Sequence, residues 1–277
     1  MTDHAFRIVN VFAESRLAGN PLCVFEDGTP FSSETMQKIA LQFNLSETTF
    51  VMPSDTATAR VRIFTPTFEM PFAGHPTLGT AHVVRAMRGS DRVTLEMPAG
   101  VIPVEAAGDV WTLDAKPPTH RQPTATRAAL ASMLGLDERA IRDEPLWVNT
   151  GSEQLIIPLA TFDDVRRVVP DAAAMLRVAS NGARVMAYVF AREADDVLAR
   201  FFFPKHGAVI EDPGTGSACA NLGGWLIARR APLPLRLRVD QGDAVLRPCR
   251  LGLEVTADGR IRVSGRVIEI GRGLVTL

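Results

Sequence analysis

A glycine-flanked turn that occurs once in each half is the feature that most constrains this chain. The first copy, residues 62–84, reads RIFTPTFEMPFAGHPTLGTAHVV, and the second, residues 200–226, reads RFFFPKHGAVIEDPGTGSACANLGGWL. In each copy a strand-like run with aromatic residues leads through a proline and a polar turn into a helix of small residues. The two copies lie about half of the 277-residue chain apart, so the chain repeats itself once.

This long, imperfect repeat predicts two similar domains rather than a solenoid. Each half reads as several strands around one helix rich in Ala, Gly, Thr and Leu, predicted at 75–87 and at 215–230. A helix of that kind is apolar nearly all round when sheet surrounds it. The first-turn N–H groups of each helix attract anions. We therefore expect the two turns to face one small anionic molecule across a cleft.

The remaining segments alternate strands with shorter helices. A Ser start and apolar residues at helical spacing predict a helix over 32–43, and residues 93–105 read as a hairpin. The stretch 116–128 is rich in Pro, Thr and charge, which is typical of a linker. The predicted domains are therefore 1–116 and 117–267.

Composition excludes several classes of partner. A net charge of −1 gives no electrostatic reason to bind nucleic acid. No apolar run approaches the roughly 18 residues of a membrane-spanning helix, and the start lacks a signal sequence, so we expect a cytoplasmic protein without a membrane partner. The three cysteines, Cys23, Cys219 and Cys249, are widely and irregularly spaced, which predicts neither a disulfide framework nor a metal site.

Two polar residues of the first half stand out as candidates for chemistry. Glu47 lies between a predicted helix and a strand, and the apolar run from Phe50 onward follows it. A carboxyl group carried into a dry cleft can take and return a proton near neutral pH. His75 follows Gly74 at the start of the small-residue helix, where it can contact a substrate or a carboxylate. From the residues alone, two alternatives stay open: Glu47 can be a surface-turn carboxylate, and His75 can be a helix-terminal histidine that bonds a neighbour.

The second half offers a matching pair. Asp212 precedes the helix of the second turn, where Asp is also a common N-terminal residue, and Ser217 can serve as a cap or a small proton relay. Asn20 is expected to be a turn residue with one substrate contact. Glu69 and Glu211 are expected to support the two turns rather than to touch substrate.

Several catalytic patterns are absent from the sequence. There is no GxxxxGK[ST] loop, no GxSxG elbow and no HExxH, and PGTGSA lacks the third glycine of a dinucleotide-binding turn. What remains is acid–base chemistry without a cofactor on a small anion.

The segments LAGNP, NLSETTFV, RIFTPTFEMPFAGHPTLGTA and EDPGTGSA resemble the PhzF family of phenazine-biosynthesis-type isomerases, and the likeness spans nearly the whole chain. This family is related in fold to diaminopimelate epimerase and proline racemase. The resemblance implies an α+β fold of two pseudo-symmetric domains, each a mixed sheet or barrel wrapped around a central helix, with the site in the cleft between them. It also implies a homodimer, no cofactor and a last strand, 268–277, that joins the first domain.

By position, the resemblance makes Glu47 the general acid/base. It places His75 and Asp212 as polar partners that contact the substrate, and Ser217 as a proton relay or ligand-binding residue. The residues it places along the ligand are Ser46, Gly74 and Gly216.

The epimerases of related fold use two opposed cysteines, but this chain has Ala73 and Pro213 at the corresponding places. A single carboxylate favours removal and redelivery of a proton on one face of the substrate. We therefore expect an isomerase of a small carboxylic acid, and the family implies trans-2,3-dihydro-3-hydroxyanthranilate as its substrate. The alternatives are an epimerase or racemase of a small amino or hydroxy acid, and a binding or interaction protein without catalysis.

Overall fold

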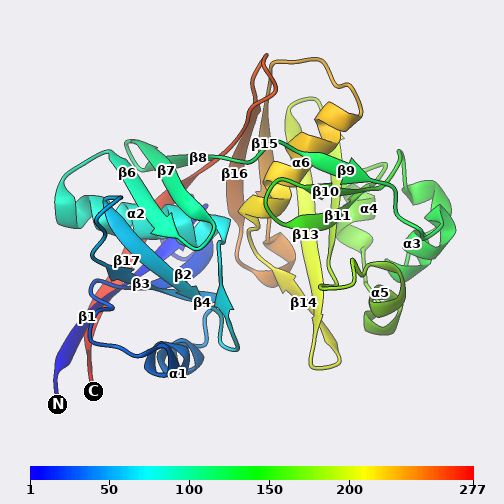
Figure 1. Ribbon diagram of the computed structural model, residues 1–277. Helices are drawn as coiled ribbons and strands as arrows, with labels where there is room; N and C mark the ends of the chain where they lie inside the picture. The colour runs from blue at the N-terminus through cyan, green and yellow to red at the C-terminus, as the bar shows by residue number, and fades with distance from the viewer. The chain divides into compact units, whose positions relative to one another are not determined.

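The computed structural model describes all residues 1–277 and divides into two compact units (Figure 1). Unit 1 consists of Met1–Asp114 and Ser264–Leu277, and unit 2 consists of Ala115–Val263. The long strand β17 (Ile261–Thr276) begins in unit 2 and ends in unit 1. No helix is both long enough and apolar enough to span a membrane.

Unit 1 is a closed circuit of strands around one helix. The pairs β1–β2, β3–β4, β6–β7 and β7–β8 are antiparallel, and β2–β3 and β4–β6 are parallel. Strand β17 pairs with both β1 and β8 and so completes the circuit. The other elements of unit 1 are β1 (Asp3–Val11), β2 (Asn20–Phe25), α1 (Ser33–Phe43), β3 (Glu47–Met52), β4 (Ala59–Phe64), β5 (Glu69–Met70), α2 (Gly74–Arg88), β6 (Arg92–Met97), β7 (Gly100–Ala107) and β8 (Val110–Asp114).

Unit 2 repeats this order of connections. An antiparallel pair, β10–β11, leads through helices to β12, which is parallel to β11. The antiparallel pair β12–β13 then leads through β14 and a helix to β15, which is parallel to β13 and antiparallel to β16. The elements of unit 2 are β9 (Thr119–Arg121), α3 (Arg127–Met133), η1 (Glu138–Ala140), β10 (Leu146–Asn149), β11 (Glu153–Pro158), α4 (Phe162–Arg167), α5 (Ala172–Val178), β12 (Ala187–Glu193), β13 (Asp196–Lys205), β14 (Ala208–Asp212), α6 (Gly216–Ala228), β15 (Leu235–Gln241), η2 (Asp243–Val245) and β16 (Cys249–Val255).

The central helix of each unit is α2 or α6. Helix α2 packs against β1, β2, β3, β6, β7 and β8, and α6 packs against β9, β10, β11 and β16. Small residues on each helix allow the strands to pack closely against it. A Cβ on Gly79 would lie 2.6 Å from Leu22 Cδ2, and one on Gly223 would lie 2.9 Å from Ile261 Cγ2. The predicted helices at 75–87 and 215–230 are confirmed as buried helices surrounded by strands, and the α+β fold class is confirmed.

The repeat extends to side chains beside the two turns. Arg62 of β4 forms a bidentate pair with Glu69 of β5, and its guanidinium lies 5.0 Å from the ring centre of Phe64. Arg200 of β13 forms the same pair with Glu211 of β14, and its guanidinium lies 4.8 Å from the Phe202 ring. Both glutamates therefore brace a turn, as predicted.

The smaller elements follow local signals in the sequence. Ser32 caps α1 by accepting a hydrogen bond from the Thr35 N–H at 3.2 Å, and Asn44 ends the helix in the left-handed region. The predicted hairpin at 93–105 is confirmed as β6 and β7.

The predicted linker at 116–128 is wrong in part. Within it, β9 pairs with β10, because Arg121 forms a bidentate pair with Glu153 and its guanidinium lies 5.0 Å from the Trp147 ring. These contacts order a segment whose composition is typical of a loop.

Candidate active site

Glu47 is the first residue of β3 and sits beside a central helix. Its side chain is 14% exposed, and its Oε2 lies 3.3 Å from Nε2 of His75. Thr48, Thr49 and Phe50, which follow it, are fully buried, so the strand enters the core directly after the carboxylate. Thr49 and Thr80 share a hydrogen bond of 2.8 Å that joins β3 to α2. This pairing fixes the strand end that carries Glu47 against the helix that carries His75.

His75 is the second residue of α2 and is buried, at 6% exposure. Burial lowers its pKa to about 3, and a hydrogen bond to the backbone of Pro21 offsets this only in part. The imidazole is therefore neutral at physiological pH, with one N–H and one lone pair. Proline has no N–H, so the ring donates its single N–H to the Pro21 carbonyl, and the Nε2 lone pair that faces Glu47 can accept from a Glu47 carboxylic acid.

Asn20 lies on the other side of the same ring. Its Nδ2 is 3.4 Å from Nδ1 of His75, and its side chain is fully buried. The expectation that Asn20 is a turn residue is wrong, because Asn20 is the first residue of β2 and pairs with Val11. The turn before it is made by Gly19, whose φ is +82°. Asn20 therefore holds the ring of His75 from inside the core.

Ser46 and Gly74 flank this group in sequence. Ser46 is exposed and immediately precedes β3, and Gly74 is the first residue of α2. The N-cap of α2 is Ala73, which has no side chain able to bond the first-turn N–H groups.

Asp212 is the last residue of β14 in unit 2, and a separate network holds it. The Thr215 hydroxyl donates to Asp212 Oδ2 and in turn accepts from Gln241 Nε2 at 3.1 Å. Gln241 is fully buried, accepts from the Thr215 N–H at 3.3 Å and donates to the Asp212 carbonyl at 2.8 Å. Asp212 is thereby held as a hydrogen-bond acceptor.

Ser217 and Gly216 open helix α6. Gly216 is buried and Ser217 is half-buried. Ser217 Oγ accepts a hydrogen bond of 2.9 Å from Gln154 Nε2. The N-cap residue, Thr215, gives no side-chain bond to the helix because its hydroxyl is engaged with Asp212. The structure thus brings Glu47, His75 and Asn20 together in unit 1, and Asp212, Gly216 and Ser217 to one helix start in unit 2.

Sequence reasoning missed the buried amides behind these residues. Gln154, Asn221 and Gln241 are 3%, 0% and 0% exposed. Gln154 bonds Ser217, Asn221 bonds Gln154, and Gln241 bonds Thr215 and the Asp212 carbonyl. A signal was available in the sequence for Asn221 alone, because it is a lone polar residue inside a small-residue, apolar run and must be satisfied when buried.

The cysteines lie outside this arrangement. Cys23, Cys219 and Cys249 are buried and unpaired, and burial raises the pKa of each thiol far above its ordinary value. No group of three or more His, Cys, Asp or Glu side chains in residues 1–277 is arranged to hold a metal ion.

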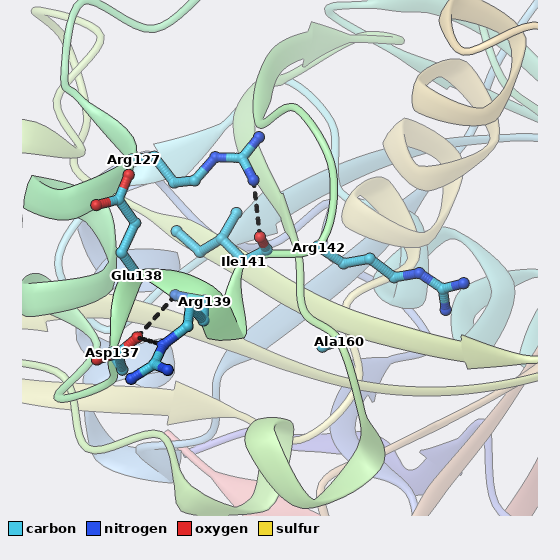
Figure 2. Close-up of a pocket in the computed structure, with 7 residues that line it drawn as sticks. All are labelled: Arg127, Asp137, Glu138, Arg139, Ile141, Arg142 and Ala160. Carbon is cyan, nitrogen blue, oxygen red and sulfur yellow. Dashed lines mark hydrogen bonds and ion pairs between the residues drawn. The ribbon is translucent and has the colours of Figure 1, made fainter.

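A hollow of about 680 Å³ lies elsewhere in unit 2, lined by Arg127, Asp137 and Arg139 among others (Figure 2). Part of its polar lining is engaged within the chain, since Arg127 Nη1 donates to the Ile141 carbonyl at 2.9 Å and Arg139 Nε donates to Asp137 at 2.9 Å. None of the candidate residues lines it, so polar chemistry rather than cavity size identifies the site.

Comparison with known proteins finds one family over nearly the whole chain. The family model for phenazine biosynthesis-like protein, PhzC-PhzF, matches residues 9–273. An uncharacterized isomerase of Pasteurella multocida is 39% identical over 287 residues, covering 99% of this chain and 94% of that protein. The trans-2,3-dihydro-3-hydroxyanthranilate isomerase of Pseudomonas chlororaphis is 33% identical over 286 residues, covering 99% and 100%. A crystal structure of a PhzF-family protein from Bacillus anthracis has the same fold, with a TM-score of 0.88 at 23% identity over 100% of both chains.

Proposed function

Because the chain belongs to the phenazine biosynthesis-like (PhzC-PhzF) family and is an isomerase, we propose that it moves a proton on a small carboxylic acid, with Glu47 as the acid/base and no cofactor. The observation that carries the proposal is the Glu47 carboxyl group, 14% exposed and 3.3 Å from a His75 ring that burial keeps neutral. A sheltered carboxyl group beside an uncharged ring is suited to taking up and returning a proton.

In the proposed reaction, Glu47 removes a proton from an activated C–H carbon of the bound acid. The negative charge spreads into the conjugated acid, where fixed N–H donors stabilise it. The protonated Glu47 then returns the proton to a different carbon on the same face. His75, whose N–H is held by the Pro21 carbonyl, would accept from the Glu47 carboxylic acid after the first transfer.

Residues of unit 2 are also proposed to bind the substrate. Asp212, held as an acceptor by Thr215, would bind an amino or hydroxyl group of the substrate, and Ser217 would bind its carboxylate. The residues proposed to line the same substrate are Ser46, Gly74, Gly216 and Asn20.

For the substrate we propose first trans-2,3-dihydro-3-hydroxyanthranilate, which supports a place in phenazine biosynthesis. The support is that the isomerases named for this compound are 33% identical to this chain over nearly its full length. We further propose that the protein works as a cytoplasmic homodimer. Light scattering on the eluting protein tests the dimer, and a monomer at micromolar concentration would exclude it.

The test of the reaction is proton exchange in D₂O followed by NMR, on trans-2,3-dihydro-3-hydroxyanthranilate and a panel of unsaturated cyclic and acyclic carboxylic acids. We expect deuterium at a new carbon together with a shifted double bond. Glu47→Gln keeps the size of the side chain but loses the proton acceptor, and should lower the exchange rate at least ~100-fold. Undiminished exchange in this variant would remove Glu47 from the role of base.

The same spectra distinguish the alternatives. Inversion at a stereocentre without movement of a double bond would indicate an epimerase, and binding of an acid without exchange would indicate a binding protein. The buried cysteines, and Ala73 and Pro213 at the places where epimerases of related fold carry theirs, favour a single-carboxylate reaction.

A further inference from the structure

A buried chain of polar side chains in unit 2 runs from the backbone of Thr150 to the hydroxyl of Ser217. Its middle members are Asn221, one turn along α6 from Ser217, and Gln154 of β11. Asn221 is 0% exposed, Gln154 is 3% exposed and Thr150 is 7% exposed, whereas Ser217 at the end of this network is half-buried. Burying two amides in an otherwise apolar core is costly unless every bond is made, so the network has a definite arrangement.

The direction of donation is fixed at the far end of the network. The Thr150 N–H can only donate, and it donates to Asn221 Oδ1 at 2.9 Å, where the Thr150 hydroxyl also donates at 2.7 Å. The Ser152 carbonyl can only accept, and it accepts from Asn221 Nδ2 at 2.8 Å. These backbone groups therefore settle which end of the Asn221 amide is oxygen and which is nitrogen.

The order of donors and acceptors set at Asn221 continues along the hydrogen-bond network to Ser217. Asn221 Nδ2 also donates to Gln154 Oε1 at 2.7 Å, so the other end of Gln154 is the nitrogen, and it donates to Ser217 Oγ at 2.9 Å. A serine hydroxyl has one proton. Since Ser217 accepts from Gln154 and makes no other hydrogen bond within the chain, its own O–H remains to donate elsewhere.

We propose that Gln154, oriented by Asn221, is a positioning residue that makes Ser217 a hydrogen-bond donor to a carboxylate of the bound acid. The inference rests on the proposed function, because it assigns the substrate carboxylate as the acceptor. The backbone groups of Thr150 and Ser152 allow only this direction of donation, and it leaves the proton of Ser217 for an acceptor outside the network.

The test is a variant that reverses the direction without changing the shape. In Gln154→Glu, an ionised carboxylate still accepts from Asn221 but has no proton to give, so Ser217 must donate inward and loses its proton for the ligand. The probe is anthranilate, a stable aromatic carboxylate, and the readout is its dissociation constant by calorimetry, relative to the wild-type protein at the same pH. We expect binding about 10-fold weaker or more at pH 8.5, the effect of one hydrogen bond to a charged group.

At pH 5.5 the carboxyl group introduced by Gln154→Glu takes up a proton and can donate again, so the relative affinity should recover. Combining Gln154→Glu with Ser217→Ala should weaken binding no further than Ser217→Ala alone. The matched control is Gln122→Glu, which adds the same charge at an exposed position of unit 2 and should bind as the wild type does at both pH values. Unchanged affinity in folded Gln154→Glu at pH 8.5, a loss equal at both pH values, or additivity with Ser217→Ala would each overturn the proposal.

Neutron diffraction from deuterium-exchanged crystals of the wild-type protein separates this inference from the proposed function, and decides it even if Gln154→Glu does not fold. We expect a Gln154 Nε2 deuteron directed at Ser217 Oγ and the Ser217 deuteron directed away from Gln154. A Ser217 deuteron directed at Gln154 overturns the positioning role whatever the protein binds. A wild-type protein that binds neither anthranilate nor trans-2,3-dihydro-3-hydroxyanthranilate would instead count against the proposed function and against a carboxylate as the acceptor.

Discussion

Nε2 of His75 lies 3.3 Å from Oε2 of Glu47, yet the two do not form an ordinary ion pair. Burial holds the pKa of His75 at about 3, so the ring carries no charge when the carboxylate does. The ring donates its one N–H to the Pro21 carbonyl, so the lone pair of Nε2 faces the Glu47 carboxyl group. A charged histidine would stabilise the carboxylate and make it a weaker base, whereas a neutral ring leaves the proton affinity of Glu47 available for catalysis.

The buried, neutral His75 predicts a specific loss of stability in acid. In the unfolded chain the ring has a pKa of roughly 6.5, above its folded value of about 3. Below pH 6.5 the ring takes up a proton in the unfolded chain but stays neutral in the folded chain. The stability that comes from keeping His75 neutral is therefore complete above pH 6.5 and is lost as the pH falls toward 3. Between pH 6.5 and 5 the loss should be about 1.5 kcal/mol, and His75→Asn should remove it.

Urea unfolding at pH 6.5 and pH 5 measures this difference. His120→Asn, at an exposed histidine, is the control and should retain the wild-type change with pH. An identical pH dependence in His75→Asn and the wild type would show that the ring is not held neutral by the fold.

The cysteines should be dispensable for the chemistry. Cys23, Cys219 and Cys249 are buried, and burial raises the pKa of each thiol, so none supplies a thiolate near neutral pH. Changing all three to Ala should leave proton exchange within a few-fold of the wild type while costing on the order of 1 kcal/mol of stability per site. A folded triple variant without exchange would revive a thiol mechanism. Thiol titration of the native wild-type protein should show no fast-reacting group.

Much of the fold could be predicted because its signals are local. Helix α1 follows from the Ser32 cap and apolar spacing, and the hairpin of β6 and β7 follows from its turn. Strand β9 could not be predicted, because its order comes from contacts of Arg121 with Glu153 and Trp147, which are remote in sequence.

The residues of the candidate site divide in the same way, into those with a local signal in the sequence and those without one. Glu47 and His75 could be named because each stands beside a recognisable turn or apolar run. Gln154 and Gln241 could not, because nothing in a strand sequence reveals that Gln154 meets a serine 63 residues away or that Gln241 meets a threonine 26 residues away. Residues that orient others depend on tertiary packing, and spacing along the chain does not record it.

The two repeat-related ion pairs should differ in their contribution to stability. Arg200 and Glu211 have side chains 14% and 8% exposed, and Arg200 also donates to the Val168 carbonyl at 2.9 Å. Arg62 and Glu69 are 23% and 35% exposed. Arg200→Met leaves a buried carboxylate unpaired and should cost about 3 kcal/mol, whereas Arg62→Met should cost about 1 kcal/mol or less.

Denaturant unfolding of the two arginine variants, each paired with its Glu→Gln counterpart in a double-mutant cycle, measures this difference. Equal costs at the two pairs would mean that burial does not distinguish them and that the repeat is energetically symmetrical.

Close packing of α2 predicts that Gly79 cannot carry a side chain without strain. A Cβ there would lie 2.6 Å from Leu22 Cδ2 and 2.9 Å from Val11 Cγ2, on the strands that support Asn20 and His75. Ala favours helix over Gly by about 1 kcal/mol, but overpacking of a dense core costs about 1–3 kcal/mol, so Gly79→Ala should be destabilising on balance. Gly271→Ala, in β17 with nothing within 4 Å of the added Cβ, is the control and should change stability by less than about 0.5 kcal/mol. A Gly79→Ala protein as stable as the wild type would show that β1 and β2 move away from the helix at little cost, and its proton exchange should then change if the position of His75 matters to Glu47.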